Sequence, residues 1–487
     1  MKACSAAQKA LDVLIALTFS AIFLVCLPSA GSAVLRCALY LGCALALVAW
    51  GGTYLSDRVL DIALALLLCA YAYLIYTAAF QLKLEPAWDF GRVYNGAKEI
   101  IINNSMAHTN NYFLESYNNF FTALYIGRFV QFAANFTSSI SVLDGGIWLN
   151  IISIVLSVVL ISLAARFYFG ARFGLMTALC CMLSLPLISY SPVFYTDTLS
   201  LPYVSLAVLL LALLLKKERA LWLKLLLGAL SGACAFMAYR VKANAAFVLV
   251  AAFMVLLLSK NRKKNISFLV SAAALCALCF VFYNIWIRNT DILDYENLDE
   301  YRLPAAHFVY MGLVGSGGYN GPAHQEMQTY SGTAAKTERS LEKIESALEE
   351  YGFSGFMEHL RAKTVYTWSD GLMYSHMKLA QSEKMYTFFH NWASPYGLRF
   401  SEYQRFGQIT HYLMLFCLAA GAIRAVFFKG ERQELLKIAL TAVFGLALLL
   451  AVWETRSRYL VNFIPLFAFC EAAFLCGISR RRDKKKG

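Results

Sequence analysis

Twelve apolar runs of about 20 residues constrain this chain more than any other feature. They lie near residues 11–30, 33–51, 59–80, 146–166, 173–190, 199–215, 221–238, 243–259, 266–286, 408–428, 436–453 and 459–478. A run of this length crosses the hydrocarbon core of a bilayer as a helix, which satisfies all of its backbone hydrogen bonds internally. Hydrophobic residues make up 59% of the chain, more than the roughly 50% of soluble domains. The sequence therefore predicts an all-α polytopic membrane protein with about 12 transmembrane helices.

The basic residues between these runs predict the topology. The net charge of +13 is divided among short clusters between apolar runs, a pattern that indicates membrane orientation rather than nucleic-acid binding. The tail at 480–486 is the most basic segment and is expected in the cytoplasm. Twelve spans then place both termini in the cytoplasm and residues 81–145 and 287–407 outside. We expect a multi-pass protein of the plasma membrane.

The spacing of the runs divides the chain into four parts. Residues 1–58 form an N-terminal transmembrane hairpin, 59–286 a membrane module with its first outer loop at 81–145, 287–407 an extracytoplasmic domain, and 408–487 the C-terminal transmembrane helices and basic tail. We read the first run as a retained anchor rather than a cleaved signal. All cysteines except Cys4 lie inside apolar runs, so they predict neither a disulfide framework nor a zinc site.

The two outer segments are expected to be mainly helical. Asp89 to Ile102 and Phe120 to Phe132 have helical periodicity and predict two juxtamembrane helices with their apolar faces on the outer leaflet. Ala334 to Lys363 predicts an amphipathic helix. Its apolar face would carry Leu341, Ile344, Leu348 and Phe353. The Gly-rich stretch Gly312 to Gly321, followed by Pro322, predicts a loop.

Four cations lie where the positive-inside pattern does not expect them. Arg240 and Lys242 lie at the outer end of one predicted span, and Arg456 and Arg458 at the outer end of another. Such cations bind phosphate oxygens strongly in a partly dry site. The alternative is that they reach lipid phosphates or pair with Glu454. Two clusters on the same side favour an anion site.

Asp89 and Asp197 are the two outer acids of interest. Asp89 follows Trp88 just after the third apolar run, and Asp197 lies where the sixth run begins. Each precedes a helical stretch, so each alternatively caps a helix, which is worth about 1 kcal/mol. His307 borders the Gly-rich loop and is a candidate site residue, although a structural role is the simpler reading. No HExxH or Walker motif is present.

Several of these motifs resemble the GT-C superfamily of polytopic glycosyltransferases. The resemblance rests on Trp88-Asp89 with the following helix, Tyr117-Asn118-Asn119, the span ending at Gly170, and Asp197 as a second outer acid. Residues 304–311, 317–320 and 453–460 add to it. The resemblance covers most of the chain from about residue 59. Within the superfamily, the chain most resembles bacterial relatives of the protein O-mannosyltransferase and lipid A aminoarabinose transferase group.

The resemblance implies an inverting transfer of a sugar from a polyprenyl-phosphate donor to an acceptor hydroxyl. It implies Asp89 as the general base, Asp197 in support, and Arg456, Arg458, Lys242 and Arg240 as donor-phosphate ligands. Acceptor or donor positioning is expected from Glu85, Arg92, Tyr94, Asn118, Asn119, His307 and Tyr459. A cell-wall polymer, glycolipid or protein would be the acceptor, and the membrane lipids are the further partner. No cofactor is certain, and a divalent metal stays open.

Two other classes of function fit parts of the sequence. Twelve spans with both ends inside are typical of secondary transporters, but carriers have two similar halves and charges near mid-membrane. Here the spans divide nine and three around residues 287–407. A non-catalytic lipid-handling protein, in which the acids only cap helices, is the third alternative.

Overall fold

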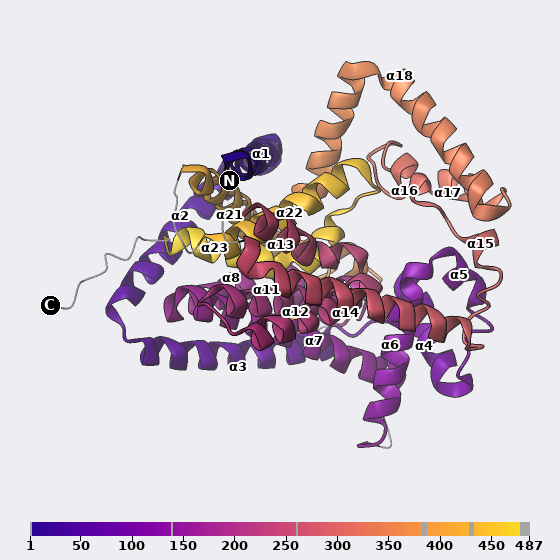
Figure 1. The fold of residues 1–487 in the computed structure, drawn as a ribbon, viewed down its shortest axis with the longest axis horizontal. Helices are drawn as coiled ribbons and strands as arrows, with labels where there is room; N and C mark the ends of the chain where they lie inside the picture. Colours follow the sequence, from indigo (N-terminus) through magenta and orange to yellow (C-terminus); the bar gives the residue numbers. More distant parts are fainter. Residues whose placement is uncertain (1, 138–139, 260–261, 382–386, 428–432, 478–487) are drawn as a thin grey trace.

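Figure 1 shows the computed structural model, which describes residues 2–137, 140–259, 262–381, 387–427 and 433–477. Within these ranges every regular element is a helix. The basic tail predicted for the cytoplasm lies outside the described residues, as does part of the cluster at 260–264. The fold class predicted from the sequence is confirmed.

Ten helical segments of the described chain are long and apolar enough to cross a membrane, and two shorter apolar helices accompany them. The long ones are built on α1 (Lys2–Cys26), α2 (Gly31–Gly51), α3 (Asp57–Gln81), α7 (Val142–Phe169), α11 (Leu201–Leu215), α12 (Leu221–Val241), α14 (Arg262–Arg288), α21 (Phe400–Phe427), α22 (Glu434–Val452) and α23 (Ile464–Leu475). The shorter ones are α8 (Ala171–Leu183) and α13 (Phe247–Leu258). Each predicted apolar run lies on one of these twelve helices, while the number that cross the bilayer stays a prediction.

Helix α7 is the central support of the functional region. Its Ser157 hydroxyl lies 2.7 Å from the Ser205 hydroxyl of α11. Two turns earlier, Asn150 donates to the backbone oxygens of Tyr190 and Ser191 over 2.9 and 2.8 Å. Apolar surroundings cannot replace these hydrogen bonds, so they fix the chain around residues 190–200 on α7. This segment follows the short helix α9 (Leu185–Ser189) and contains Asp197.

Ion pairs join α3 and α7 near both ends. Arg166 donates to both carboxylate oxygens of Asp61 over 2.9 and 2.6 Å. At the opposite end Lys83 lies 2.7 Å from Asp144. The two helices therefore pack antiparallel in one register, and α3 delivers the chain to the segment that carries Asp89.

The first outer segment contains both predicted helices, α4 (Trp88–Asn103) and α6 (Tyr117–Ala133). A third, α5 (Asn110–Glu115), was not predicted because it has less than two turns of periodicity. The apolar faces of α4 and α6 pack against each other: a Cβ on Gly127 would lie 3.2 Å from the backbone oxygen of Ala97. The position of this face relative to the outer leaflet stays a prediction.

The second outer segment is also helical. It contains α15 (Leu298–Tyr301), α16 (Ala305–Met311), α17 (Gly321–Gln328), α18 (Gly332–Trp368), α19 (Ser375–Leu379) and α20 (Phe388–Ala393). The predicted loop lies between α16 and α17. The next helix, α21, begins at Phe400, before the predicted residue 408.

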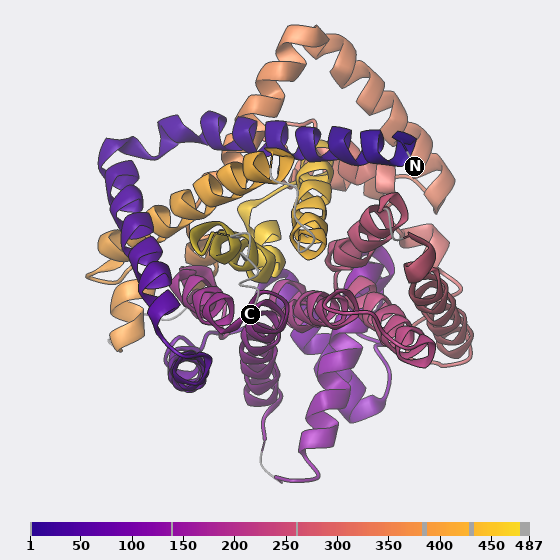
Figure 2. The same ribbon diagram turned by 60° about the vertical axis from the view of Figure 1, so that its left-hand side comes forward.

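The predicted amphipathic helix is confirmed as α18, but it does not bury all of its apolar face. It bends at Gly352, where φ is 55°, a conformation that glycine adopts without strain. In Figure 2 the two arms rise as a chevron above α1. Leu341 is 54% exposed and Phe353 84% exposed, because the bend carries the apex away from the helical bundle.

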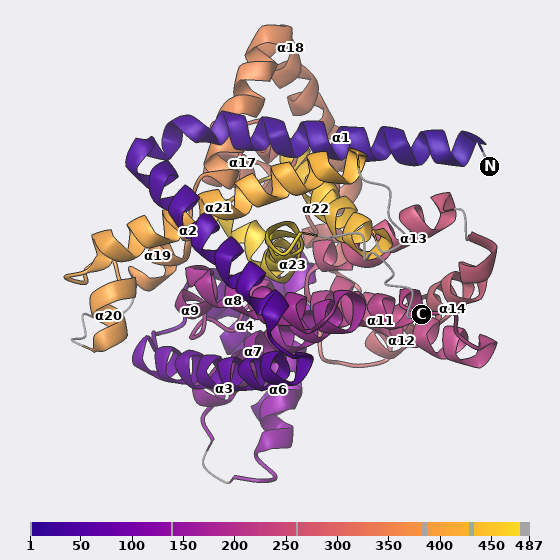
Figure 3. The same cartoon turned by 90° about the vertical axis from the view of Figure 1, so that its left-hand side faces the viewer.

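The N-terminal helix α1 crosses beneath α18 and packs against α21, as Figure 3 shows. The hydroxyl of Tyr412 in α21 donates to the backbone oxygen of Cys26 over 2.8 Å. The remaining 3₁₀ turns are Leu27–Ser29, Gly52–Tyr54, Ala243–Ala246 and η4 (Ser457–Phe463). The last of these presents the C-terminal cations to the outer segments.

Candidate functional site

Asp89 lies in the first turn of α4 and is 42% exposed. Its Oδ1 accepts a hydrogen bond from the Tyr112 hydroxyl over 3.2 Å. Its Oδ2 lies 3.7 Å from Nη2 of Arg458. The side chain makes no capping hydrogen bond, because the N-cap residue is Ala87. Asp89 is thus an accessible carboxylate held by a phenol and a guanidinium.

Asp197 lies in the short helix α10 (Thr196–Leu199) and its side chain is only 4% exposed. It forms an ion pair with Lys242, whose side chain is 13% exposed. Tyr195 is the N-cap residue and makes no side-chain capping bond. The alternative in which Thr196 or Asp197 caps this helix is therefore wrong, since the carboxylate faces a buried cation instead.

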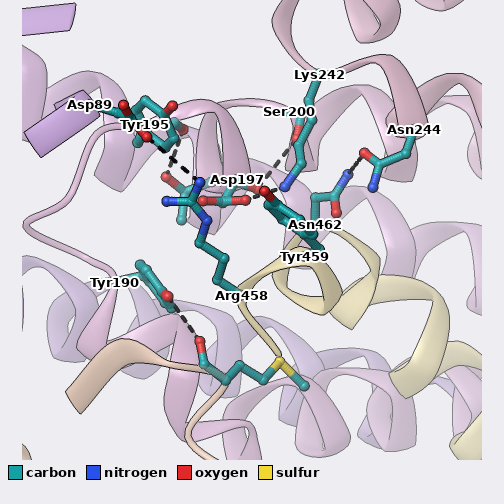
Figure 4. Close-up of polar contacts among 12 residues, drawn as sticks. Asp89, Tyr190, Tyr195, Asp197, Ser200, Lys242, Asn244, Arg458, Tyr459 and Asn462 are labelled. Atoms are coloured by element: carbon teal, nitrogen blue, oxygen red, sulfur yellow. Dashed lines mark hydrogen bonds and ion pairs between the residues drawn. The ribbon is translucent and has the colours of Figure 1, made fainter. Parts of the chain in front are cut away.

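Arg458 and Tyr459 join these two acids into one cluster (Figure 4). The Arg458 guanidinium carbon lies 5.7 Å from the centre of the Tyr195 ring, and the Lys242 ammonium lies 5.0 Å from the centre of the Tyr459 ring. We call Asp89, Asp197, Lys242 and Arg458 the acid–cation cluster. Its members come from four separate regions of the chain, and only the tertiary fold brings them together.

Arg456 stands beside this cluster and is fixed by the segment before α19. Its Nη1 donates to the Tyr374 hydroxyl over 2.8 Å. The backbone N–H of Tyr374 and the hydroxyl of Ser457 both donate to Asp370 Oδ2, over 2.6 and 2.8 Å. Asp370 therefore anchors the chain on both sides of the Arg456–Tyr374 contact.

A chain of hydrogen bonds supports Asp89 from the other side. Nδ2 of Asn119 donates to the Tyr112 hydroxyl over 2.6 Å, and its Oδ1 accepts from Tyr195 over 3.2 Å and from Asn118 over 3.1 Å. Burial, followed by the charge of Asp89, raises the pKa of the Tyr112 hydroxyl. The phenol therefore stays protonated and remains a donor to the carboxylate.

Glu454 and Tyr459 lie at the edge of the acid–cation cluster. The Tyr459 hydroxyl donates to Glu454 Oε1 over 3.2 Å. Burial raises the pKa of the Glu454 carboxyl, and the nearby Arg458 opposes this shift. The alternative in which Glu454 pairs with the neighbouring arginines does not describe the geometry, because Glu454 accepts a hydrogen bond from Tyr459 and the ion pair of Arg458 is with Asp89.

Among the predicted site residues outside the acid–cation cluster are Arg240, Tyr94, Glu85 and Arg92. Arg240 donates to the Tyr283 hydroxyl over 2.7 Å, and its guanidinium carbon lies 4.1 Å from the centre of that ring. Tyr94 is half-buried near Phe194, at 6.4 Å between ring centres. Glu85 and Arg92 are exposed, and within the described contacts no ion pair joins either of them to the acid–cation cluster.

His307 lies in a second polar group, with His324 and Glu115. Its ring is fully buried, and neither nitrogen has a hydrogen-bond partner. The ring centres of His307 and His324 are 5.9 Å apart, and His324 Nε2 lies 2.5 Å from Glu115 Oε1. Burial, together with His324, lowers the pKa of His307 to about 4. His307 is therefore a neutral buried imidazole at pH 7.

The sequence reasoning missed several residues of this region. Tyr112 and Tyr195 are ordinary tyrosines in the sequence, and their roles depend on hydrogen bonds between distant segments. Lys378 of α19 is buried, with its ammonium nitrogen 3.0 Å from the centre of the Trp88 ring. No sequence signal marks Lys378, whereas the sequence Tyr195-Thr196-Asp197 places Tyr195 near one of the predicted acids.

Both carboxylates of the acid–cation cluster are already paired with cations. Asp197 is engaged by Lys242 and Asp89 by Arg458. Within the described chain no three His, Cys, Asp or Glu side chains gather as a set of metal ligands. Whether the site uses a divalent metal stays open, because one or two carboxylates and a substrate phosphate can hold Mg²⁺.

Three comparisons with known proteins bear on the family. A family described as "Conserved hypothetical integral membrane protein" matches residues 43–476. Among solved structures, the chain is similar to the crystal structure of ArnT from Cupriavidus metallidurans bound to undecaprenyl phosphate, at a TM-score of 0.36 and 11% identity over 84% of this chain and 77% of that one. The comparison with curated proteins gives no match.

Proposed function

The chain belongs to that family of integral membrane proteins, and we propose that it is an inverting glycosyltransferase of the GT-C type. It would move a sugar from a polyprenyl-phosphate donor to an acceptor hydroxyl on the outer face of the membrane. The acceptor would be a cell-wall polymer, a glycolipid or a protein. Membrane lipids would surround the helices and supply the donor from the plane of the bilayer.

The convergence of the acid–cation cluster carries this proposal. Two carboxylates and two cations meet although residues 89, 197, 242 and 458 are far apart in the sequence. Asp197 and Arg458 lie at the starts of apolar segments, and Lys242 directly follows the end of another. A cluster at span ends suits a lipid headgroup reacting at the membrane surface. A mid-membrane transport site would instead place its charges near the centres of the spans.

The chemistry follows from the two kinds of charge. The acceptor hydroxyl would hydrogen-bond to Asp89, the more exposed acid, and pass its proton to that carboxylate as its oxygen attacks the anomeric carbon. The bond from that carbon to the phosphate oxygen would break, and the phosphate would leave with the electron pair. Arg458 and Arg456 would stabilise the growing negative charge. Asp197 would hold Lys242 in place for the same purpose.

The other predicted site residues take supporting roles in this proposal. Asn119 would position Asp89 through Tyr112, with Asn118 and Tyr459 bordering the same region. Glu85, Arg92, Tyr94 and Arg240 would contact the acceptor or the outer parts of the donor rather than the reacting atoms. His307, whose ring is fully buried, would act only by positioning the segment beside the Gly-rich loop. None of these residues forms an ion pair with the acid–cation cluster among the described contacts, which favours effects on affinity over effects on the bond-breaking step.

The substitution Asp89→Asn tests the proposal. Purified protein in nanodiscs would receive radiolabelled polyprenyl-phosphate hexoses and pentoses with a cell-envelope extract as acceptor. Loss of a general base lowers turnover by about 10²- to 10⁴-fold, while the affinity for undecaprenyl phosphate stays within a few-fold. Glu99→Gln is the matched control, because it makes the same change on the same helix and is expected to keep full turnover.

Two results would contradict the proposal. One is an Asp89→Asn protein that transfers sugar at the wild-type rate. The other is an Asp89→Cys protein that a membrane-impermeant maleimide labels, above the background of the parent chain, only from the cytosolic face. Either result would favour one of the other two functions, a secondary transporter or a non-catalytic lipid-handling protein.

A further inference from the structure

Lys378 is a buried cation at the edge of the acid–cation cluster. It lies on α19, is 7% exposed, and places its ammonium nitrogen 3.0 Å from the centre of the Trp88 ring. The same nitrogen lies 5.6 Å from the centre of the Tyr374 ring. Trp88 directly precedes Asp89, so Lys378 links α19 to the helix that carries the proposed base.

The backbone around this contact is strained. Among the described residues, four that are not glycine have positive φ, and three of them border Lys378: Trp88 at 45°, Met373 at 47° and Tyr374 at 66°. Such conformations cost about 1 to 3 kcal/mol each and are found mostly at functional sites.

This conformation brings the Lys378 amine toward Arg456 and Arg458. Arg456 lies 5.1 Å and Lys378 5.6 Å from the centre of the same Tyr374 ring. Arg458 approaches from the other side through its ion pair with Asp89. Arg456, Arg458 and the Lys378 amine thus lie around one exposed carboxylate, Asp89, and together they can offer several N–H donors to the oxygens of a phosphate.

We propose that Lys378 is a phosphate ligand of the polyprenyl-phosphate donor, held on the face of Trp88 until the lipid headgroup arrives. This inference rests on the proposed function and extends it to a residue outside the clusters recognised in the sequence. Donor binding draws the ammonium group from the indole ring to the phosphate oxygens, and Trp88 keeps the adjacent Asp89 positioned for the acceptor.

The surroundings of Lys378 predict how this contact responds to pH. Burial lowers the pKa of the Lys378 amine to about 6; Arg458 and Arg456 add to this shift, and Asp89 and Asp197 oppose it. These charged groups come from α4, α10 and the 456–458 segment, while the facing rings of Trp88 and Tyr374 stay neutral at pH 7. The free protein therefore holds a largely neutral amine at pH 7, and a bound phosphate raises the pKa of that amine and takes up a proton.

The experiment measures the affinity for undecaprenyl phosphate in phosphatidylcholine nanodiscs between pH 6 and pH 8. The comparison includes wild type, K378R and K378M. Arginine stays charged throughout this range, so the ratio of wild-type to K378R affinity cancels the ionisation of the lipid itself. We expect this ratio to fall on the order of 10-fold or more from pH 6 to pH 8, following a pKa near 6. K378M binds weakly at every pH.

The outcomes separate this inference from the proposed function. If wild type binds the lipid and the ratio to K378R is flat, or K378M binds as well as wild type, Lys378 only joins α19 to α4 and the inference is wrong. If wild type does not bind undecaprenyl phosphate at all, the proposed function fails as well. A K378M protein that does not fold leaves the comparison with K378R decisive. Asn391→Asp, in the neighbouring helix α20, is the control for a charge change outside the site.

Discussion

The buried pair Asp197–Lys242 gives the sharpest test of the site's electrostatics. The two side chains are 4% and 13% exposed, so each charge depends on the other for solvation. The substitutions Lys242→Met and Asp197→Asn each leave one ionisable group alone in this site. Breaking a buried pair in this way costs about 3 to 5 kcal/mol, since the remaining charge has lost its partner.

The size of the destabilisation follows from the free energy needed to neutralise the lone ionisable group, since this costs less than keeping its charge buried. In Lys242→Met the carboxyl takes up a proton; from an unfolded-state pKa of about 3.9 this costs about 4 kcal/mol at pH 7 and about 1.5 kcal/mol at pH 5. In Asp197→Asn the amine loses a proton; from an unfolded-state pKa of about 10.4 this costs about 5 kcal/mol at pH 7 and about 2 kcal/mol at pH 9. The figures for Lys242→Met are upper values, because Arg458 lies in the same cluster and stabilises a charged Asp197 carboxylate.

The two variants should therefore lose stability with opposite pH dependence. Lys242→Met recovers as the pH falls and Asp197→Asn as it rises, while the double variant is less destabilised than the sum of the single ones. Reversible unfolding in mixed micelles, followed from pH 5 to pH 9, measures all three. The exposed pair Arg361–Glu358 is the control, with Arg361→Met expected to cost under about 1 kcal/mol. Parallel pH profiles for the two single variants would refute a buried, mutually solvated pair.

Two further predictions concern other parts of the fold. A side chain on Gly232 would meet the backbone of Ala272. Gly232→Leu should therefore force α12 and α14 apart and lower the free energy of unfolding by about 1 to 3 kcal/mol. Ala233→Leu is the control, and equal unfolding free energies for the two variants would contradict close packing of these helices. The folded-state pKa of His307, about 4, lies below the ordinary value near 6.5. The unfolded chain therefore takes up this proton first, and stability should fall by about 3 kcal/mol as the pH drops through 6.5 to 4. His307→Phe should remove that loss, and an unchanged acid transition would show that the imidazole is not buried neutral.

The sequence by itself determined the membrane class and most of the helices. Runs of about 20 apolar residues leave the backbone no alternative to a helix in a lipid environment, which is why every run is recovered. Local periodicity was also enough for α4, α6 and α18. The sequence further singled out Asp89, Asp197, Lys242 and Arg458, since charges beside apolar runs are costly and therefore informative.

Only the tertiary structure decided how these residues meet. The pairing of Asp197 with Lys242, the contact of Arg458 with Asp89 and the exclusion of Arg240 depend on which helices pack together, and hydrophobic periodicity does not encode helix partners. Lys378 shows the same limit: in the sequence it is one lysine in a polar segment, and its burial against Trp88 exists only because α19 folds back onto α4. Local patterns report what each segment tolerates, whereas a site made from distant segments depends on packing between them.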